Sequence, residues 1–200
     1  MSKIVQHEKR RAEILAKALD VFVEEGFENT TFQKIADHAG ITRTILYTYF
    51  SNKREIFNFS IKQLLSIVEN DLVMVRKNKN LNCVEKLTRV ITLIIDRFEE
   101  NRKLISIVYD LLSHIQTGKN DADYRVRRRT VKVRHILASM VIDGIRSGEL
   151  QNVNVRVVDD LLYSIIEAAI FRLTVLKKQS VAALKDVAAL AVQQLAVHPR

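Results

Sequence analysis

Helix-breaking residues are scarce in this chain of 200 residues, and the scarcity limits the folds that it can adopt. The sequence holds five Gly and one Pro, and neither type occurs between Gly40 and Gly118. Hydrophobic residues supply 48% of the sequence, which is enough to build real cores. Because Leu, Ala, Lys and Glu favour helices whereas Gly and Pro end them, we predict an all-α fold of about nine helices.

The formal net charge is +9, but the charge is spread unevenly. Residues 1–54 carry nine basic and seven acidic side chains, and the remaining residues carry 23 basic and 16 acidic ones. The positive charge fits a nucleic-acid partner, yet most of it lies outside the first 54 residues. A DNA-binding function must therefore rest on the pattern of residues and not on bulk charge.

Cysteine usage and hydropathy favour a cytoplasmic protein with no membrane partner. The single cysteine, Cys83, cannot form an internal disulfide, which agrees with a reducing compartment. The N-terminal residues lack the apolar run and cleavage site of a signal peptide, and no window approaches about 18 uninterrupted apolar residues.

Residues 31–57 contain the most informative pattern, TFQKIADHAGITRTILYTYFSNKREIF. Two short helical patterns flank a tight turn at residues 39–41, and Thr31 and Thr42 stand where helix N-caps are expected. In a helix-turn-helix, the first helix crosses the DNA backbone and the second enters the major groove. The pattern therefore favours a DNA-binding regulator.

Residues 1–54 are predicted to form a three-helix DNA-binding domain. Its first helix, at about residues 7–25, ends at Gly26 and carries an apolar stripe at helical spacing. Ile45 and Leu46 are expected to supply the buried contacts of the recognition helix. The predicted core of the domain comprises Phe22, Ile35, Leu46 and Phe50.

Residues 55–200 are predicted to form an effector-binding and dimerisation domain. A capping box of Asn52 and Glu55 begins a connecting helix at about residues 53–76. Further helices are expected at about residues 83–98, 103–115, 122–147, 155–176 and 181–197.

The last two predicted helices are apolar over most of their circumference, as in LLYSIIEAAIFRLTVL and VAALKDVAALAVQQLAV. A surface that apolar is usually an interface. We therefore expect a homodimer built as a four-helix bundle, with contacts from Leu161, Ile165, Ala169, Leu184, Val187, Leu190 and Ala191.

The chain resembles the TetR (tetracycline-repressor-like) family of transcriptional regulators over its full length. The stronger part is T-x-x-x-I-A-D-H-A-G-I-T, then L-Y-x-Y-F and K-x-E-I-F, within residues 31–57. The weaker part is G-I-R-S-G-E-L-Q at residues 144–151, with the apolar helix after it. The resemblance implies a homodimer, a palindromic operator on double-stranded DNA, and repression relieved by a small-molecule effector.

Four residues of the helix-turn-helix are candidates for direct contact with DNA. Thr31 and Thr42 cap helices whose N-termini also bind phosphate. Arg43 can bind a guanine through two hydrogen bonds, and the Thr44 methyl can meet a thymine methyl. The family often has a small residue where Thr44 stands, so base preference cannot be carried over from relatives, whereas the docking mode can.

Three further residues match positions that in the family mostly hold phosphates, namely Tyr47, Tyr49 and Lys53. Such residues position the protein on DNA and do not specify a sequence. Tyr49 stands where the family commonly has His, and a core aromatic explains it nearly as well.

Candidate effector-pocket residues lie on otherwise apolar helical faces: Tyr109, Met140, Tyr163 and Glu167. Tyr163 and Glu167 fit a dimer seam equally well. Arg129 lies at the edge of an apolar stripe and is a fifth candidate. The rest of its basic run is expected on a solvated face, at Arg125, Arg127, Arg128, Lys132 and Arg134.

No motif of an enzyme occurs: the chain lacks G-x-x-x-x-G-K-[ST], G-x-G-x-x-G, G-x-S-x-G and H-E-x-x-H. Its five His are scattered, so neither a metal site nor another cofactor is expected. The alternative to a ligand-responsive regulator is an effector-independent, architectural DNA-binding protein. Such a protein would not need the large helical domain behind its DNA-binding head.

Overall fold

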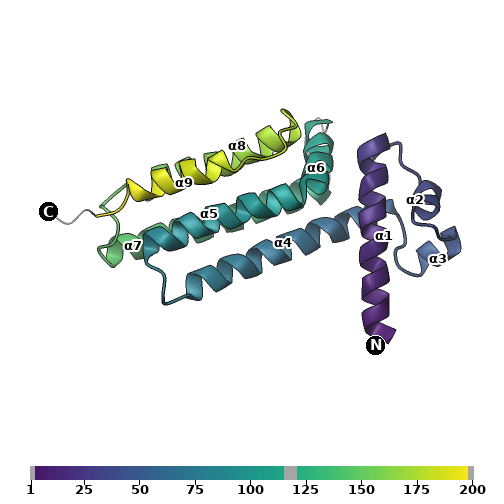
Figure 1. Ribbon diagram of the computed structural model, residues 1–200, viewed down its shortest axis with the longest axis horizontal. Coiled ribbons are helices and arrows are strands. Elements are labelled where there is room, and N and C mark those ends of the chain that lie inside the picture. The colour runs from purple at the N-terminus through teal and green to yellow at the C-terminus, as the bar shows by residue number, and fades with distance from the viewer. Residues whose placement is uncertain (1–2, 115–120, 198–200) are drawn as a thin grey trace. The chain divides into compact units, whose positions relative to one another are not determined.

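The computed structural model describes residues 3–114 and 121–197, with side chains for residues 5–111 and 131–197. Within these residues it consists of nine α-helices and no strand, as the sequence predicts (Figure 1). None of the helices in the described ranges is long and apolar enough to cross a membrane. The helices are α1 (Lys3–Glu25), α2 (Phe32–His38), α3 (Arg43–Tyr47), α4 (Lys53–Lys77), α5 (Cys83–Glu100), α6 (Arg102–His114), α7 (Asp121–Arg146), α8 (Val155–Thr174) and α9 (Ala183–Gln193).

Three predicted helix ends are confirmed, namely the end of α1 before Gly26 and the capped starts of α2 and α3, whereas α1 begins at Lys3 and not at about residue 7. Thr31 Oγ1 accepts a hydrogen bond from the Lys34 amide, and Thr42 Oγ1 accepts one from the Ile45 amide, each at 3.2 Å. These bonds satisfy amides that have no partner within the first helical turn. Gly26 follows α1 with φ of 80°, a conformation that favours glycine.

The capping box predicted at the start of α4 forms only in part. Asn52 Oδ1 accepts from the Glu55 amide at 2.9 Å. The Glu55 carboxylate, however, accepts from the side chain and the amide of Ser51, both at 2.6 Å. These two bonds lower the pKa of Glu55. A complete capping box, which the sequence analysis missed, begins α5 with Asn82 and Glu85.

The chain forms two compact units. The first boundary between them falls within α4, after Leu64, whereas the predicted domain boundary is at residue 54. The first unit contains α1 to α3, α4 up to Leu64, and α6 from Lys103 onward. The second contains the rest of α4 with α5, α7, α8 and α9. Helix α4 therefore contributes residues to both units.

The core of the first unit confirms four predicted residues and corrects one. Phe22, Ile35, Leu46 and Phe50 are all buried. Ile45, however, is 44% exposed, so its predicted burial is wrong. Successive residues of a helix point about 100° apart, and a single short helix that buries Leu46 turns its neighbour away.

The core of the second unit forms where α5 packs against α7, α8 and α9, and Figure 1 shows α9 running alongside α5. Its largest fully buried side chains come from α4, α5 and α7: Leu72, Leu87, Ile91, Ile95 and Leu137. Ile165 and Ala169 of α8 and Leu184 of α9 are buried here too. These three predicted dimer contacts are therefore core residues of a single chain.

Candidate DNA-binding surface and effector pocket

The recognition helix α3 has one buried anchor and an exposed remainder. Leu46 is fully buried, whereas Arg43, Thr44, Ile45 and Tyr47 are exposed. The short helix thus presents its first turn to solvent, as a helix that enters the major groove must. The sequence analysis missed Ile45, whose apolar side chain can meet a thymine methyl as the Thr44 methyl can.

Arg43 and Tyr47 lie one helical turn apart and contact each other. Arg43 Nη2 donates a hydrogen bond to the Tyr47 hydroxyl at 3.0 Å. The Tyr47 ring packs against Phe32 at the start of α2, with 4.8 Å between ring centres. Two residues that were predicted to contact different parts of DNA are therefore linked in the protein alone.

Tyr49 is half-buried and stacks on a residue of the first helix. Its ring centre lies 4.7 Å from that of His7, with 25° between the planes. Nothing local in the sequence links His7 to residue 49, so this contact could not be predicted from the pattern.

Lys53 binds the loop between α1 and α2. Its ammonium group donates to the carbonyl oxygens of Phe27 and Glu28 at 2.8 Å and of Thr30 at 2.9 Å. An ammonium group has three protons, so these bonds use all of them. A phosphate at Lys53 would have to compete with this loop for the same protons.

Arg11 is a further residue of this unit that the sequence analysis missed. Its guanidinium carbon lies 3.9 Å from the ring centre of Phe59 and 4.8 Å from that of Phe50. Its Nε is buried and has no hydrogen-bond partner. Cation–π contacts thus hold α1 against the start of α4.

Of the predicted effector-pocket residues that the structure describes in the second unit, Met140 is the one that lines a cavity. Met140 is buried and lines a cavity, whereas Glu167 is exposed and Tyr163 is half-buried beside Arg134. Tyr109 is half-buried in α6 of the first unit. Arg129 lies outside the residues whose side chains the structure describes.

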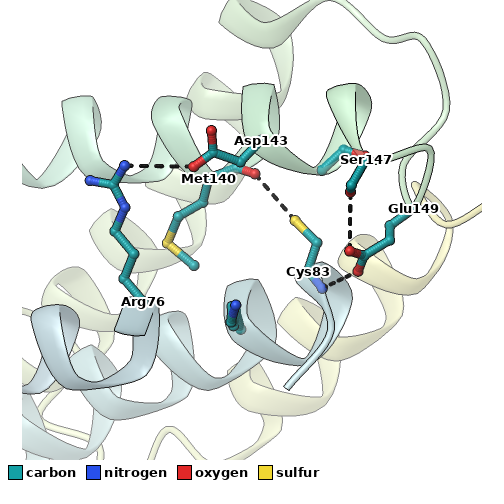
Figure 2. Close-up of a pocket in the computed structure, with 8 residues that line it drawn as sticks. Arg76, Cys83, Met140, Asp143, Ser147 and Glu149 are labelled. Atoms are coloured by element: carbon teal, nitrogen blue, oxygen red, sulfur yellow. Dashed lines mark hydrogen bonds and ion pairs between the residues drawn. The ribbon is translucent and has the colours of Figure 1, made fainter. Parts of the chain in front are cut away.

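The cavity at Met140 has a volume of about 160 Å³ and opens to solvent (Figure 2). Its lining comes from the end of α4, the start of α5 and the end of α7 with the loop that follows. Charged groups of both signs surround it: Arg76, Lys86, Asp143 and Glu149. Among the described residues, no group of three His, Cys, Asp or Glu could hold a metal ion.

Glu149 fastens the loop after α7 to the start of α5, as Figure 2 shows. One carboxylate oxygen accepts from the Cys83 amide and the other accepts from the Ser147 hydroxyl at 3.0 Å. Burial and the nearby charge of Glu149 together raise the pKa of the Cys83 thiol to about 11. The thiol donates to the Met140 carbonyl oxygen at 3.2 Å.

Two members of the basic run form ion pairs, and Lys132 is exposed as expected whereas Arg134 is half-buried. Arg134 of α7 binds Asp159 and Asp160 of α8, with 2.8 Å between Arg134 Nε and Asp159 Oδ2. Lys132 binds Glu69 of α4 at 2.8 Å. The side chains of Arg125, Arg127 and Arg128 lie outside the described residues.

The capped helices α2 and α3 with the turn between them have the geometry of a helix-turn-helix, and comparison with known proteins shows what the chain is similar to. The model of bacterial regulatory proteins of the tetR family matches residues 14–58. A TetR transcription regulator from Haloarcula marismortui superposes with a TM-score of 0.76 at 20% identity, covering 95% of this chain and 100% of that one. Residues 14–58 therefore match the tetR family of bacterial regulatory proteins, and the chain has the fold of a TetR transcription regulator.

Two curated relatives of the chain are named as regulators. The fatty acid metabolism regulator protein of Bacillus subtilis is 23% identical over 174 residues, which cover 82% of this chain and 84% of the relative. The biofilm operon icaADBC negative transcriptional regulator IcaR of Staphylococcus aureus is 29% identical over 87 residues, which cover 44% of this chain and 46% of the relative.

Proposed function

We propose that the protein is a homodimeric repressor that binds a palindromic operator and releases it when a small molecule binds. The observation that carries the proposal is the pairing of an exposed recognition helix with exposed apolar stripes on α8 and α9. The recognition helix can bind one half-site of an operator. The apolar stripes of α8 and α9 can join two subunits, each with its own recognition helix.

The proposed dimer surface follows one face of each C-terminal helix. On α8 the exposed large apolar residues Val157, Leu161 and Phe171 follow helical spacing. On α9 Val187 and Leu190 do the same, and Leu190 is 64% exposed. Two such helices from each of two subunits can form a four-helix bundle. Because a two-fold interface is self-complementary, the same residues face each other across it.

The operator follows from this symmetry. Two heads related by a two-fold axis read two half-sites that face the same side of the duplex, about one helical turn or somewhat more apart. Selection of binding sequences from random DNA tests this, and a single preferred half-site without a palindrome would contradict it.

Arg43 and Lys53 are proposed to act differently on this operator. Arg43→Ala should cost about 1–3 kcal/mol on the selected operator and relax preference at one base pair per half-site. Lys53→Ala should lower the affinity for all DNA sequences alike. The substitution frees the loop that Lys53 holds and removes a positive charge that would lie near the DNA phosphates. If both variants lost equal affinity on the operator and on random DNA, the assignment of Arg43 to base reading and of Lys53 to positioning would be wrong.

The genes of fatty acid metabolism are the first targets to test. The Bacillus subtilis relative, which is matched over most of both chains, is named for that metabolism. Genomic footprinting of the protein, followed by inspection of the neighbouring genes, tests both the operator and the target. Footprints at random positions, with no shared sequence, would favour the architectural alternative.

A further inference from the structure

Tyr47 holds the side chain that is proposed to read a base, and its role follows from three contacts in the first unit. Arg43 and Tyr47 are the first and last residues of α3, four positions apart, so their side chains meet on one face of the helix. The guanidinium group donates to the Tyr47 hydroxyl at 3.0 Å. Its carbon also lies 5.6 Å from the centre of the Tyr47 ring.

The Tyr47 ring is itself fixed from the side of α2. Phe32 contacts it with 4.8 Å between ring centres and 48° between the planes. Phe32 is the first residue of α2, and the Thr31 cap sets where that helix begins. Tyr47 is 50% exposed, yet its position is set by a helix other than its own.

Fixing Arg43 before DNA arrives has an energetic consequence. An exposed arginine samples many rotamers and loses that freedom when it binds a base. A side chain already held in its binding conformation loses less, which strengthens the complex without any new contact. The hydroxyl occupies one of the five guanidinium donors and leaves the others for a base.

We propose that Tyr47 is a positioning residue that orients Arg43 for base recognition, and that phosphate binding is not its main role. The inference rests on the proposed function, because it needs a preferred operator that Arg43 helps to choose. It changes the expected result of altering Tyr47. A phosphate contact would support all DNA sequences alike, whereas an orienting contact supports only those that Arg43 reads.

The test is Tyr47→Phe, which removes the hydroxyl and keeps the ring that packs on Phe32. Thr48→Ala is the matched control, because it removes the hydroxyl of the adjacent residue, which donates to the Ile45 carbonyl oxygen and not to Arg43. Affinities are measured by fluorescence anisotropy on the selected operator and on random DNA. Each substitution is made in the wild type and in the Arg43→Ala background, with thermal unfolding by circular dichroism as the check of fold.

Tyr47→Phe should weaken operator binding by about 3- to 10-fold, the loss expected for one hydrogen bond, and leave binding to random DNA unchanged. In the Arg43→Ala background it should have no further effect. An equal loss in both backgrounds, or full affinity of Tyr47→Phe, would overturn the inference. If the wild type selects no preferred sequence, the proposed function fails at that earlier step and the inference fails with it.

Discussion

Cys83 shows how the surroundings of one side chain set its chemistry. The residue stands at the start of α5, where a helix terminus could favour a thiolate. Burial opposes this effect and, with Glu149 beside the thiol, raises the pKa to about 11. A thiol held in its protonated form reacts slowly, since the thiolate is the nucleophile. The structure therefore argues against Cys83 as a redox sensor at neutral pH.

The raised pKa of Cys83 predicts a loss of stability in alkaline solution. The unfolded chain releases the thiol proton near the ordinary pKa of 9.0, whereas the folded chain keeps it until about pH 11. Above the lower value the unfolded state binds fewer protons, so the free energy of unfolding falls as pH rises. The loss should be on the order of 2 kcal/mol and complete above the folded pKa.

Urea unfolding of the wild type and of Cys83→Ala between pH 8 and pH 11 measures this loss. The variant lacks the thiol, so its stability should change less over that range. Other groups titrate in both proteins alike, and the difference between the two curves isolates Cys83. Parallel curves would show that the thiol titrates equally in the folded and unfolded states.

Thr42 predicts a second effect at the scale of one residue. Its hydroxyl caps a helix of only five residues, so Thr42→Ala should destabilise the first turn of α3 by about 1 kcal/mol. Because that turn carries Arg43, DNA affinity should fall as well. Thr48→Ala is the control, since the Thr48 hydroxyl donates to the Ile45 carbonyl oxygen at the end of α3 and does not cap its first turn. Equal effects of the two changes on affinity would argue against a role for the cap.

At the scale of elements, Gly144 permits α7 to approach α5. A Cβ at this position would lie 2.4 Å from Cys83 Sγ and 2.7 Å from side-chain atoms of Leu150. Alanine normally favours a helix over glycine. Here the clash should outweigh that preference, and Gly144→Ala should destabilise the protein by about 1–3 kcal/mol.

The double variant Gly144→Ala with Cys83→Ala provides the matched control for this prediction. It removes the nearer of the two clashes, so it should lose less stability than the two single losses added together. Thermal unfolding of the four proteins gives the comparison. If the stability losses of the two single variants added up to that of the double variant, the clash of the new Cβ with the Cys83 sulfur would not contribute to the loss.

Local signals in the sequence were sufficient to predict the helices and several of their ends. Thr31, Thr42 and Gly26 act within one turn of their own position, so the pattern around each residue contains the information needed. The predicted start of α5 at residue 83 and that of α8 at residue 155 are confirmed for the same reason.

Contacts between distant residues could not be predicted in this way. The bonds of Lys53 reach back to residues 27–30, and the His7 ring meets Tyr49 across 42 positions of sequence. The apolar stripes of α8 and α9 were predicted as a dimer surface without separating their two faces. Ile165 turned out to face the chain's own core, because a helix that is apolar all round packs on both sides.

At the scale of the whole molecule, the proposed dimer makes a prediction that separates interface from core. Leu161→Glu and Leu190→Glu place charges on exposed apolar positions and should yield folded monomers. Ile165→Arg is unsuitable because that residue is buried within one chain. Val73→Glu, on an exposed apolar position of α4, is the matched control and should remain dimeric. Light scattering at micromolar concentration gives the mass, and a monomeric wild type would end the proposal.

The coupling between effector and operator is the last prediction, and α4 is its proposed carrier. This helix belongs to both units: Lys53 and Ile61 lie in the first, and Leu72 lies in the second. With 25 residues it spans roughly 38 Å, so a small rotation at one end displaces the other appreciably.

An effector can bias such a motion only if it binds the two arrangements with different affinity. By reciprocity, the operator must then weaken effector binding by the factor by which the effector weakens operator binding. Calorimetry of the effector with and without operator measures that factor directly. Identical affinities in the two titrations would mean that the protein binds DNA without regard to the ligand.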